Sequence, residues 1–376
     1  MKIPNYMAAT YASLIFLLLA SFTSTAQDNS FQKAVEALEE ERFEDAIGYF
    51  TEHISENPKD KEAYNQRGVA RNAMANYYGA IGDFNYAIDL DESFAAAYIN
   101  RADAKFNLGD DEGAVDDYDQ GIELDPENVD GYVGRAFAKY NLDDLQGAYF
   151  DFSKAIDLDP QNPDTYFNRA VVRAELEEFV GAIDDYTKSI DLDGTEADVY
   201  SYRGVARYNL GQLDEAMEDY NTAIKMDAED PVKFENRALA YTALEQFDKA
   251  LEDYNKSIAL FDEDPDVYNM RGVVQYNLEN HEAAIEDYNR AIELDETNPV
   301  YYDNRALSKA AVEDYSGAVK DYSFSIDLYP SDPETFLQRG LAKIAMGDKY
   351  DGCLDLNTAK ELGAEEIDSY LKEHCK

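Results

Sequence analysis

The sequence is poor in the residues that usually carry catalysis or bind metals. Its 376 residues include two cysteines, three histidines and no tryptophan. The histidines, His53, His281 and His374, are scattered, and neither an HExxH nor a CxxC motif occurs, so nothing points to a zinc site or a histidine-based catalytic set. A glycine-rich phosphate-binding loop is also missing. We therefore expect no enzymatic activity, no cofactor and no metal site.

Positive charge is scarce as well. Lysine and arginine number 33 against 79 acidic residues, which gives a net charge of −46. Such a surface repels nucleic acid and anionic lipid. It either attracts basic partners or divalent cations, or only maintains solubility. Asp262, Asp264 and Asp266 resemble the start of a calcium loop, but its glycine is missing and Val273 takes the place of its final glutamate, which leaves only weak, diffuse calcium binding as an alternative.

Long apolar runs are absent except near the N-terminus. Lys2 precedes an apolar stretch over residues 7–22, and small residues end at Ala26. This layout predicts a secretory signal peptide over residues 1–26, cut before Gln27, and hence a periplasmic or extracellular protein. The run is short for a spanning helix, so we expect no stable membrane insertion after cleavage, and an uncleaved anchor is the alternative.

The two cysteines, Cys353 and Cys375, both lie near the C-terminus. Export would place them in an oxidising compartment, where a disulfide is plausible. It would close a loop of about 20 residues and contribute roughly 3 kcal/mol in the chain-entropy model. The alternative is a pair of buried, unbonded thiols.

A period of 34 residues runs through the rest of the chain. With Lys61 as position 1 of a repeat, position 20 is alanine in eight repeats from Ala80 to Ala318, and position 24 is Phe or Tyr from Phe84 to Tyr322. Position 4 is aromatic in Tyr64, Tyr98, Tyr132, Tyr166, Tyr200, Phe234, Tyr268, Tyr302 and Phe336. The same register gives ten repeats, which start near residues 27, 61, 95, 129, 163, 197, 231, 265, 299 and 333.

Each repeat reads as two helices. Apolar residues recur at helical spacing over positions 1 to 14, and a Gly, Asp or Asn near position 15 or 16 breaks the run. One helix pair cannot bury its apolar face alone, so neighbouring repeats must stack and the ends need caps. Residues 27–363 are the predicted solenoid. After Gly363, residues 364–376 read as an amphipathic helix that caps its open end.

These columns resemble the tetratricopeptide repeat family, with an aromatic residue at position 4, a small one at 8, alanine at 20, an aromatic at 24 and proline at 32. The resemblance covers nearly all of the chain after residue 26. It implies an all-α fold, a right-handed superhelical α-solenoid whose first helices line a concave groove. It also implies a non-catalytic scaffold that binds protein or peptide partners.

Two charged columns depart from the family pattern. Position 7 holds Arg67, Arg101, Arg135, Arg169, Arg203, Arg237, Arg271, Arg305 and Arg339. Position 23 holds Asp83, Asp117, Asp151, Asp185, Asp219, Asp253, Asp287, Asp321 and Asp355. The first repeat lacks both, having Lys33 and Tyr49. We interpret the columns as a structural ion-pair ladder within repeats that fixes helix register; a ligand-binding arginine ladder is the alternative.

Positions 2, 5, 9, 12 and 13 of the first helix face the groove in this family. Positions 12 and 13 hold Phe106-Asn107, Tyr140-Asn141, Tyr208-Asn209 and Tyr276-Asn277, in alternate repeats except for the first two. An asparagine directly before the position-7 arginine and a serine at position 27 also recur in alternate repeats. This indicates that a 68-residue double repeat has been duplicated. Tyrosine and asparagine suit recognition of an extended peptide, so these are candidate partner-binding residues. Alternatively, Tyr-Asn-Leu only ends the first helix.

The sequence thus predicts an exported scaffold that binds peptide or protein segments in its groove, with no nucleic acid partner. A different class of function is the alternative. The chain would then be an envelope ligand-binding protein that captures cations, basic proteins or cell-wall material through its acidic surface.

Overall fold

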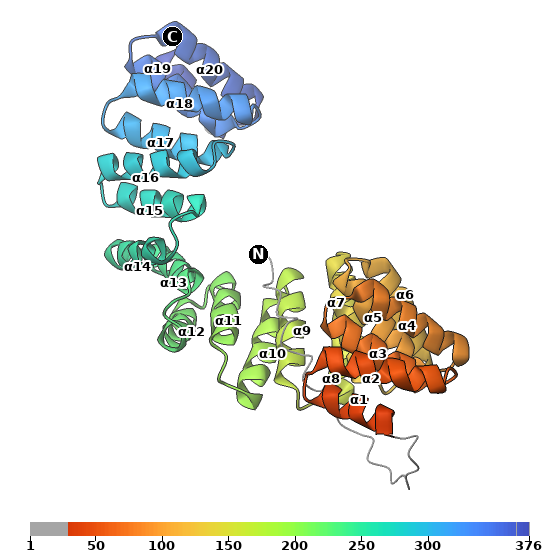
Figure 1. Ribbon diagram of the computed structural model, residues 1–376. Helices are drawn as coiled ribbons and strands as arrows, with labels where there is room; N and C mark the ends of the chain where they lie inside the picture. Colours follow the sequence, from red (N-terminus) through yellow and green to blue (C-terminus); the bar gives the residue numbers. More distant parts are fainter. Residues whose placement is uncertain (1–28, 366, 376) are drawn as a thin grey trace. The chain divides into compact units, whose positions relative to one another are not determined.

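The computed structural model describes residues 29–365 and 367–375, and over these residues the chain forms α-helices and no strand. The predicted signal peptide and its cleavage site lie outside the described residues. The chain divides into two compact units, Met1–Thr195 and Glu196–Lys376 (Figure 1). No helix within the described residues is both long and apolar enough to cross a membrane.

The first unit holds five helix pairs, one per repeat. They are α1 (Asn29–Glu39), α2 (Phe43–Glu56), α3 (Lys61–Ala73), α4 (Tyr77–Leu90), α5 (Ala95–Asn107), α6 (Asp111–Leu124), α7 (Val129–Asn141), α8 (Leu145–Leu158), α9 (Pro163–Glu175) and α10 (Phe179–Leu192).

The second unit holds five more pairs and a terminal helix. They are α11 (Ala197–Asn209), α12 (Leu213–Met226), α13 (Pro231–Ala243), α14 (Phe247–Leu260), α15 (Pro265–Asn277), α16 (His281–Leu294), α17 (Pro299–Ala311), α18 (Tyr315–Leu328), α19 (Pro333–Ala345), α20 (Lys349–Glu361) and α21 (Ile367–His374). In each unit, the helices of a pair pack on one another and on the next pair (Figure 1). This confirms the predicted all-α solenoid of 34-residue helix pairs.

Side-chain caps explain where many of the helices begin. Asn162 accepts hydrogen bonds from the backbone N–H groups of Asp164 and Thr165, and Pro163 occupies the first turn of α9, where no N–H is needed. Asp144 caps α8 in the same way by accepting from Gly147. The short polar residues between apolar stretches therefore set the helix starts.

The core consists of the columns that define the repeat. Alanine at position 20 and the aromatic ring at position 24 are buried, as in Ala216 and Tyr220. A Cβ atom added to Gly204, at position 8, would lie 2.6 Å from the Tyr220 ring, which is too close. The small residue at position 8 thus lets the two helices of this repeat approach around the ring.

The C-terminal end is closed by α21. Its Ile367 is buried and clusters with Leu337, Leu356 and other apolar residues of α19 and α20. A disulfide joins Cys353 of α20 to Cys375, directly after α21. The last repeat therefore has a covalently attached cover in place of a following repeat.

Candidate functional site

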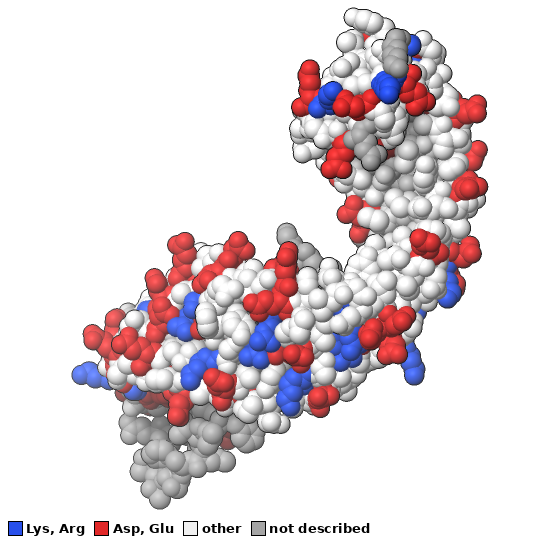
Figure 2. Space-filling model, turned by 180° about the vertical axis from the view of Figure 1, so that it is seen from behind, with Lys and Arg blue, Asp and Glu red and all other residues white. Residues whose placement is uncertain are grey.

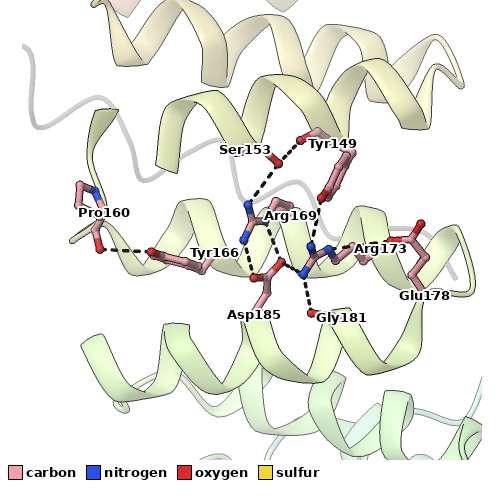
Figure 3. Close-up of polar contacts among 9 residues, drawn as sticks. All are labelled: Tyr149, Ser153, Pro160, Tyr166, Arg169, Arg173, Glu178, Gly181 and Asp185. Carbon is pink, nitrogen blue, oxygen red and sulfur yellow. Dashed lines mark hydrogen bonds and ion pairs between the residues drawn. The ribbon is translucent and has the colours of Figure 1, made fainter. Parts of the chain in front are cut away.

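The ladder arginines are held from several sides, as Arg169 shows (Figure 3). Its Nε and Nη2 atoms donate to the two carboxylate oxygens of Asp185, at 2.8 and 2.7 Å. Nη1 donates to Ser153 Oγ of the preceding repeat at 3.2 Å. The Tyr166 ring, at position 4, lies 5.8 Å from the guanidinium carbon, within the range of cation–π attraction.

The structure brings together all nine predicted Arg–Asp pairs. Each is bidentate, with Nη2 to Oδ1 distances of 2.5 to 2.8 Å, and the aspartates are 2 to 6% exposed. Each arginine belongs to the first helix of a repeat and each aspartate to the second helix of the same repeat. A two-point bond of this kind fixes how the two helices slide and rotate against each other.

A second cation reaches the same aspartate in seven repeats. It comes from position 11, 2.7 to 2.9 Å from Oδ2, and the residues are Arg71, Lys105, Lys139, Arg173, Arg207, Lys309 and Lys343. Repeats 7 and 8 have Tyr241 and Gln275 there instead. In repeat 8, burial raises the pKa of Asp287 above its ordinary value, while Arg271 opposes the rise.

The hydrogen bond from the arginine to the preceding repeat is a structural contact that the sequence prediction missed. In eight repeats, Nη1 of the arginine donates to a short polar residue at position 25 of the repeat before. These acceptors are Thr51, Asn85, Asp119, Ser153, Asn221, Asn255, Asn289 and Ser323. The restriction of position 25 to Thr, Asn, Asp and Ser was the available signal. With their donors committed inside the solenoid, the arginines have little to offer a ligand.

The candidate partner-binding residues at positions 12 and 13 are only partly open. Phe106, Tyr140, Tyr208 and Tyr276 are half-buried against the helix pairs. Burial is also the main cause of the raised pKa of Tyr140.

The asparagines beside these rings bond within the chain. Asn209 and Asn277 donate to the carbonyl oxygens of Val205 and Val273, at 2.8 and 2.7 Å. Asn141 donates to Asp111 Oδ1 at 3.1 Å, and Asn107 also has a partner. Bonds to carbonyls four residues earlier favour the helix-ending interpretation for these amides, which leaves the rings as the remaining candidates.

A more open surface lies on the first helices of repeats 7 to 9, in the second unit. Val232, Met270, Val300 and Leu307 are 49, 38, 49 and 36% exposed. They occupy positions 2, 6 and 9, which fall on one side of a helix. Carboxylates share this side, and we call the whole surface the first-helix face. It consists of Val232 and Glu235 on α13, Asp266 and Met270 on α15, and Val300, Asp303 and Leu307 on α17.

The acidic character extends beyond this face. On the side shown in Figure 2, acidic side chains outnumber basic ones in both units. Yet within residues 29–365 and 367–375 no group of three His, Cys, Asp or Glu side chains is arranged to hold a metal ion. Asp264, from the segment that resembles a calcium loop, instead caps α15 by accepting from the Asp266 N–H.

Comparison with known proteins finds matches to the same repeat family over parts of the chain. A model described as "Tetratricopeptide repeat" matches residues 197–230 and 265–298, and one described as "TPR repeat" matches residues 102–143 and 238–279. A search of curated proteins found no match.

Among the solved structures that match, two with TM-scores above 0.5 share the fold. The C-terminal part of a TPR repeat-containing protein from Cytophaga hutchinsonii is 19% identical, with a TM-score of 0.54, over 64% of this chain and 98% of its own. A tetratricopeptide repeat protein from Parabacteroides merdae is 18% identical, with a TM-score of 0.52, over 66% and 99%. YrrB, described as a TPR protein with an unusual peptide-binding site, is 26% identical, with a TM-score of 0.44, over 48% and 92%.

Proposed function

We propose that this chain is a non-catalytic scaffold that holds an extended peptide or protein segment on its first-helix face, as its matches to tetratricopeptide repeat models over residues 102–143, 197–230, 238–279 and 265–298 suggest. The observation that carries this proposal is the set of exposed apolar side chains on three consecutive first helices, at Val232, Met270, Val300 and Leu307. Exposed apolar side chains in line mark an interaction site more often than isolated ones do.

We further propose that the scaffold works outside the cytoplasm, as the predicted signal peptide over residues 1–26 implies. The bond between Cys353 and Cys375 supports this, because structural disulfides persist in oxidising compartments.

Selection from a random peptide library displayed on phage tests the binding proposal. The bait is the chain from residue 27 onward, and the peptides it selects are then measured against a variant with Val232→Ser, Val300→Ser and Leu307→Ser. We expect binding to weaken by about tenfold, because the anchoring apolar contacts are lost.

A matched control removes exposed apolar side chains from second helices of the same unit, with Phe324→Ser, Tyr350→Ser and Leu354→Ser. This variant should bind as the unchanged chain does. The proposal fails if the library yields no specific peptide, or if both variants bind it equally well.

A further inference from the structure

Three carboxylates on the first-helix face are fixed in place without a cation. Their partners are neutral hydroxyls. Ser257 Oγ donates to Glu235 Oε1 at 2.6 Å and Tyr301 Oη to Asp266 Oδ1 at 2.5 Å. Asp303 is bonded by Ser325, and its Oδ2 lies 3.1 Å from Thr335 Oγ1, a hydroxyl that is closer to Asp332, at 2.6 Å. The other oxygen of Asp303, Oδ1, is buried and has no hydrogen-bond partner among the described residues. These carboxylates are oriented, and no charge of the described chain offsets them.

Each carboxylate has an exposed apolar neighbour on the same helix. Val232 precedes Glu235 by three residues, and Val300 precedes Asp303 by three. Met270 follows Asp266 by four. Residues three or four apart lie next to one another on a helix surface. The first-helix face therefore presents an apolar contact beside an anionic one on three consecutive first helices.

The pKa values of two of these carboxylates are raised, as expected for buried negative charges with no cation beside them. Burial raises the pKa of Asp303 to about 6, and the nearby charge of Asp332 adds to the rise. Burial also raises the pKa of Glu235, and Asp264 and Asp266 lie close enough to add to the shift. A cation placed here would relieve both the desolvation and the repulsion.

A carboxylate cluster elsewhere in this unit binds the ammonium group of a lysine of the chain. Lys233, at position 3 of repeat 7, is buried with its ammonium 2.7 Å from Asp198, 3.1 Å from Asp227 and 2.5 Å from Asp230. One double repeat later, Asp266 occupies the position that corresponds to Asp198.

At this second junction the position that corresponds to Lys233 is Tyr301. The tyrosine hydroxyl supplies a hydrogen bond to Asp266 but no positive charge. The solenoid therefore provides its own ammonium at one junction and leaves the equivalent carboxylate of the next without one.

We propose that the partner of the first-helix face is a basic segment, an extended chain in which lysine or arginine side chains are separated by apolar ones. This inference rests on the proposed function and specifies its ligand. The cations pair with Glu235, Asp266 and Asp303, and the apolar side chains lie against Val232, Met270 and Val300. Charge complementarity selects such a segment over neutral or acidic ones.

Two synthetic peptides of about twelve residues test this, one repeating Lys-Ser-Val-Ser and one repeating Glu-Ser-Val-Ser, because every second side chain of an extended chain points to the same face. Each is titrated by calorimetry into the chain from residue 27 onward and into the charge-neutral variant Glu235→Gln, Asp266→Asn and Asp303→Asn. We expect the lysine peptide to bind the unchanged chain and the glutamate peptide not to bind. The variant should lose about tenfold in affinity for the lysine peptide.

The matched control is Glu218→Gln, Glu252→Gln and Glu286→Gln, which removes the same number of charges from exposed sites on the second helices of this unit. It should change the affinity by less than about twofold, because those charges are screened. Equal losses in both variants, or no loss in the first, would overturn the inference and reduce the binding to general attraction by an acidic surface. Circular dichroism melts show whether each variant is folded.

The outcomes also separate this inference from the proposed function. If the phage library yields peptides that bind the first-helix face but carry no excess of lysine or arginine, the scaffold function stands and the basic segment is wrong. If the library yields nothing and the lysine peptide does not bind, the proposed function itself fails.

Discussion

Eight of the nine ladder arginines connect more than the two helices of their own repeat. Arg101, for example, bonds Asp117 with two nitrogens, donates to Asn85 of the preceding repeat at 2.6 Å and lies over the Tyr98 ring. Buried ion pairs often add little net stability, because desolvation offsets their attraction. Their effect is instead to destabilise any alignment of the two helices that separates the arginine from its aspartate. The ladder therefore determines how the two helices of a repeat align more than it raises the free energy of unfolding.

Removing one aspartate should expose this dependence. Asp219→Ala leaves Arg203 and Arg207 without their shared carboxylate, and we expect the second unit to lose about 3 kcal/mol of unfolding free energy. Glu218→Ala, at the exposed neighbouring position, should cost less than about 0.5 kcal/mol. Urea unfolding and hydrogen exchange in α11 and α12 measure both. Equal, negligible losses would contradict the structural role of the ladder.

At the scale of the helix pair, the repeats are not equally well supported. Repeat 8 has Gln275 where seven other repeats carry the second cation, so Asp287 is paired with Arg271 alone. Because the pKa of Asp287 is raised in the folded state, the folded protein binds this proton more tightly than the unfolded chain. The unfolding free energy therefore falls as the pH rises from the ordinary pKa of the carboxyl to its raised value.

Restoring the missing cation should strengthen this pair. In Gln275→Lys we expect a geometry like that of Lys309 with Asp321, which are 2.7 Å apart. The pKa of Asp287 should fall and the unfolding free energy should rise by about 1 kcal/mol at neutral pH.

The pH dependence separates this charge effect from a change in packing. Near pH 3, about where an unperturbed carboxyl is mostly protonated, the gain should vanish. Denaturant unfolding at the two pH values and NMR titration of Asp287 check both parts. Gln275→Met serves as the uncharged control, and an equal gain in it would rule out the electrostatic explanation.

The turns within helix pairs show where sequence reasoning stops. The pattern predicts a break near position 15, and the structure has a left-handed residue at that position in all ten repeats, although only Gly109, Gly211 and Gly347 are glycines. Glu177 adopts φ 60° there, and the next residue, Glu178, donates its N–H to the Arg173 carbonyl at 2.8 Å. Packing of the two helices imposes this conformation, so residue preferences alone did not reveal it.

At the scale of the whole molecule, the ladder changes how the net charge is distributed. Positions 7 and 11 take up 16 of the 33 basic residues, whereas the aspartate column takes up nine of the 79 acidic ones. The positive charge that remains for the surface is therefore smaller than composition suggests. This strengthens the expectation that nucleic acid is repelled and that a partner is basic.

The predicted export can be checked on the intact protein. Material isolated from its native host should have the mass of residues 27–376 less two hydrogens, because the signal peptide is removed and Cys353 is bonded to Cys375. Reduction should add the two hydrogens back. A mass that includes residues 1–26 would contradict cleavage, and two alkylatable thiols before reduction would contradict the disulfide in the native protein.

Much of the fold could be predicted because it repeats. Columns of alanine and aromatic residues gave the helix pairs, and two charged columns gave the Arg–Asp partners. The first-helix face was not predicted, although positions 2, 5 and 9 face the groove in this family, because no residue type recurs there: position 5 is Glu235 and Asp303 in repeats 7 and 9 but Asn269 in repeat 8. The proximity of Glu235, Asp266 and Asp303 depends on which helices become neighbours. The contact to position 25 was missed for the same reason, since it joins different repeats.

The hydrogen bonds from the arginines to position 25 all run in one direction along the chain, from each repeat to the one before it. Eight of the nine arginines donate a hydrogen bond to position 25 of the preceding repeat. In the last repeat the residue at position 25, Asn357, instead donates to the Cys353 carbonyl at 2.7 Å. A double repeat inserted or removed in the same register would keep an arginine facing a short polar residue at each new joint. Recombination between repeat-encoding segments therefore preserves this contact when it lengthens or shortens the solenoid.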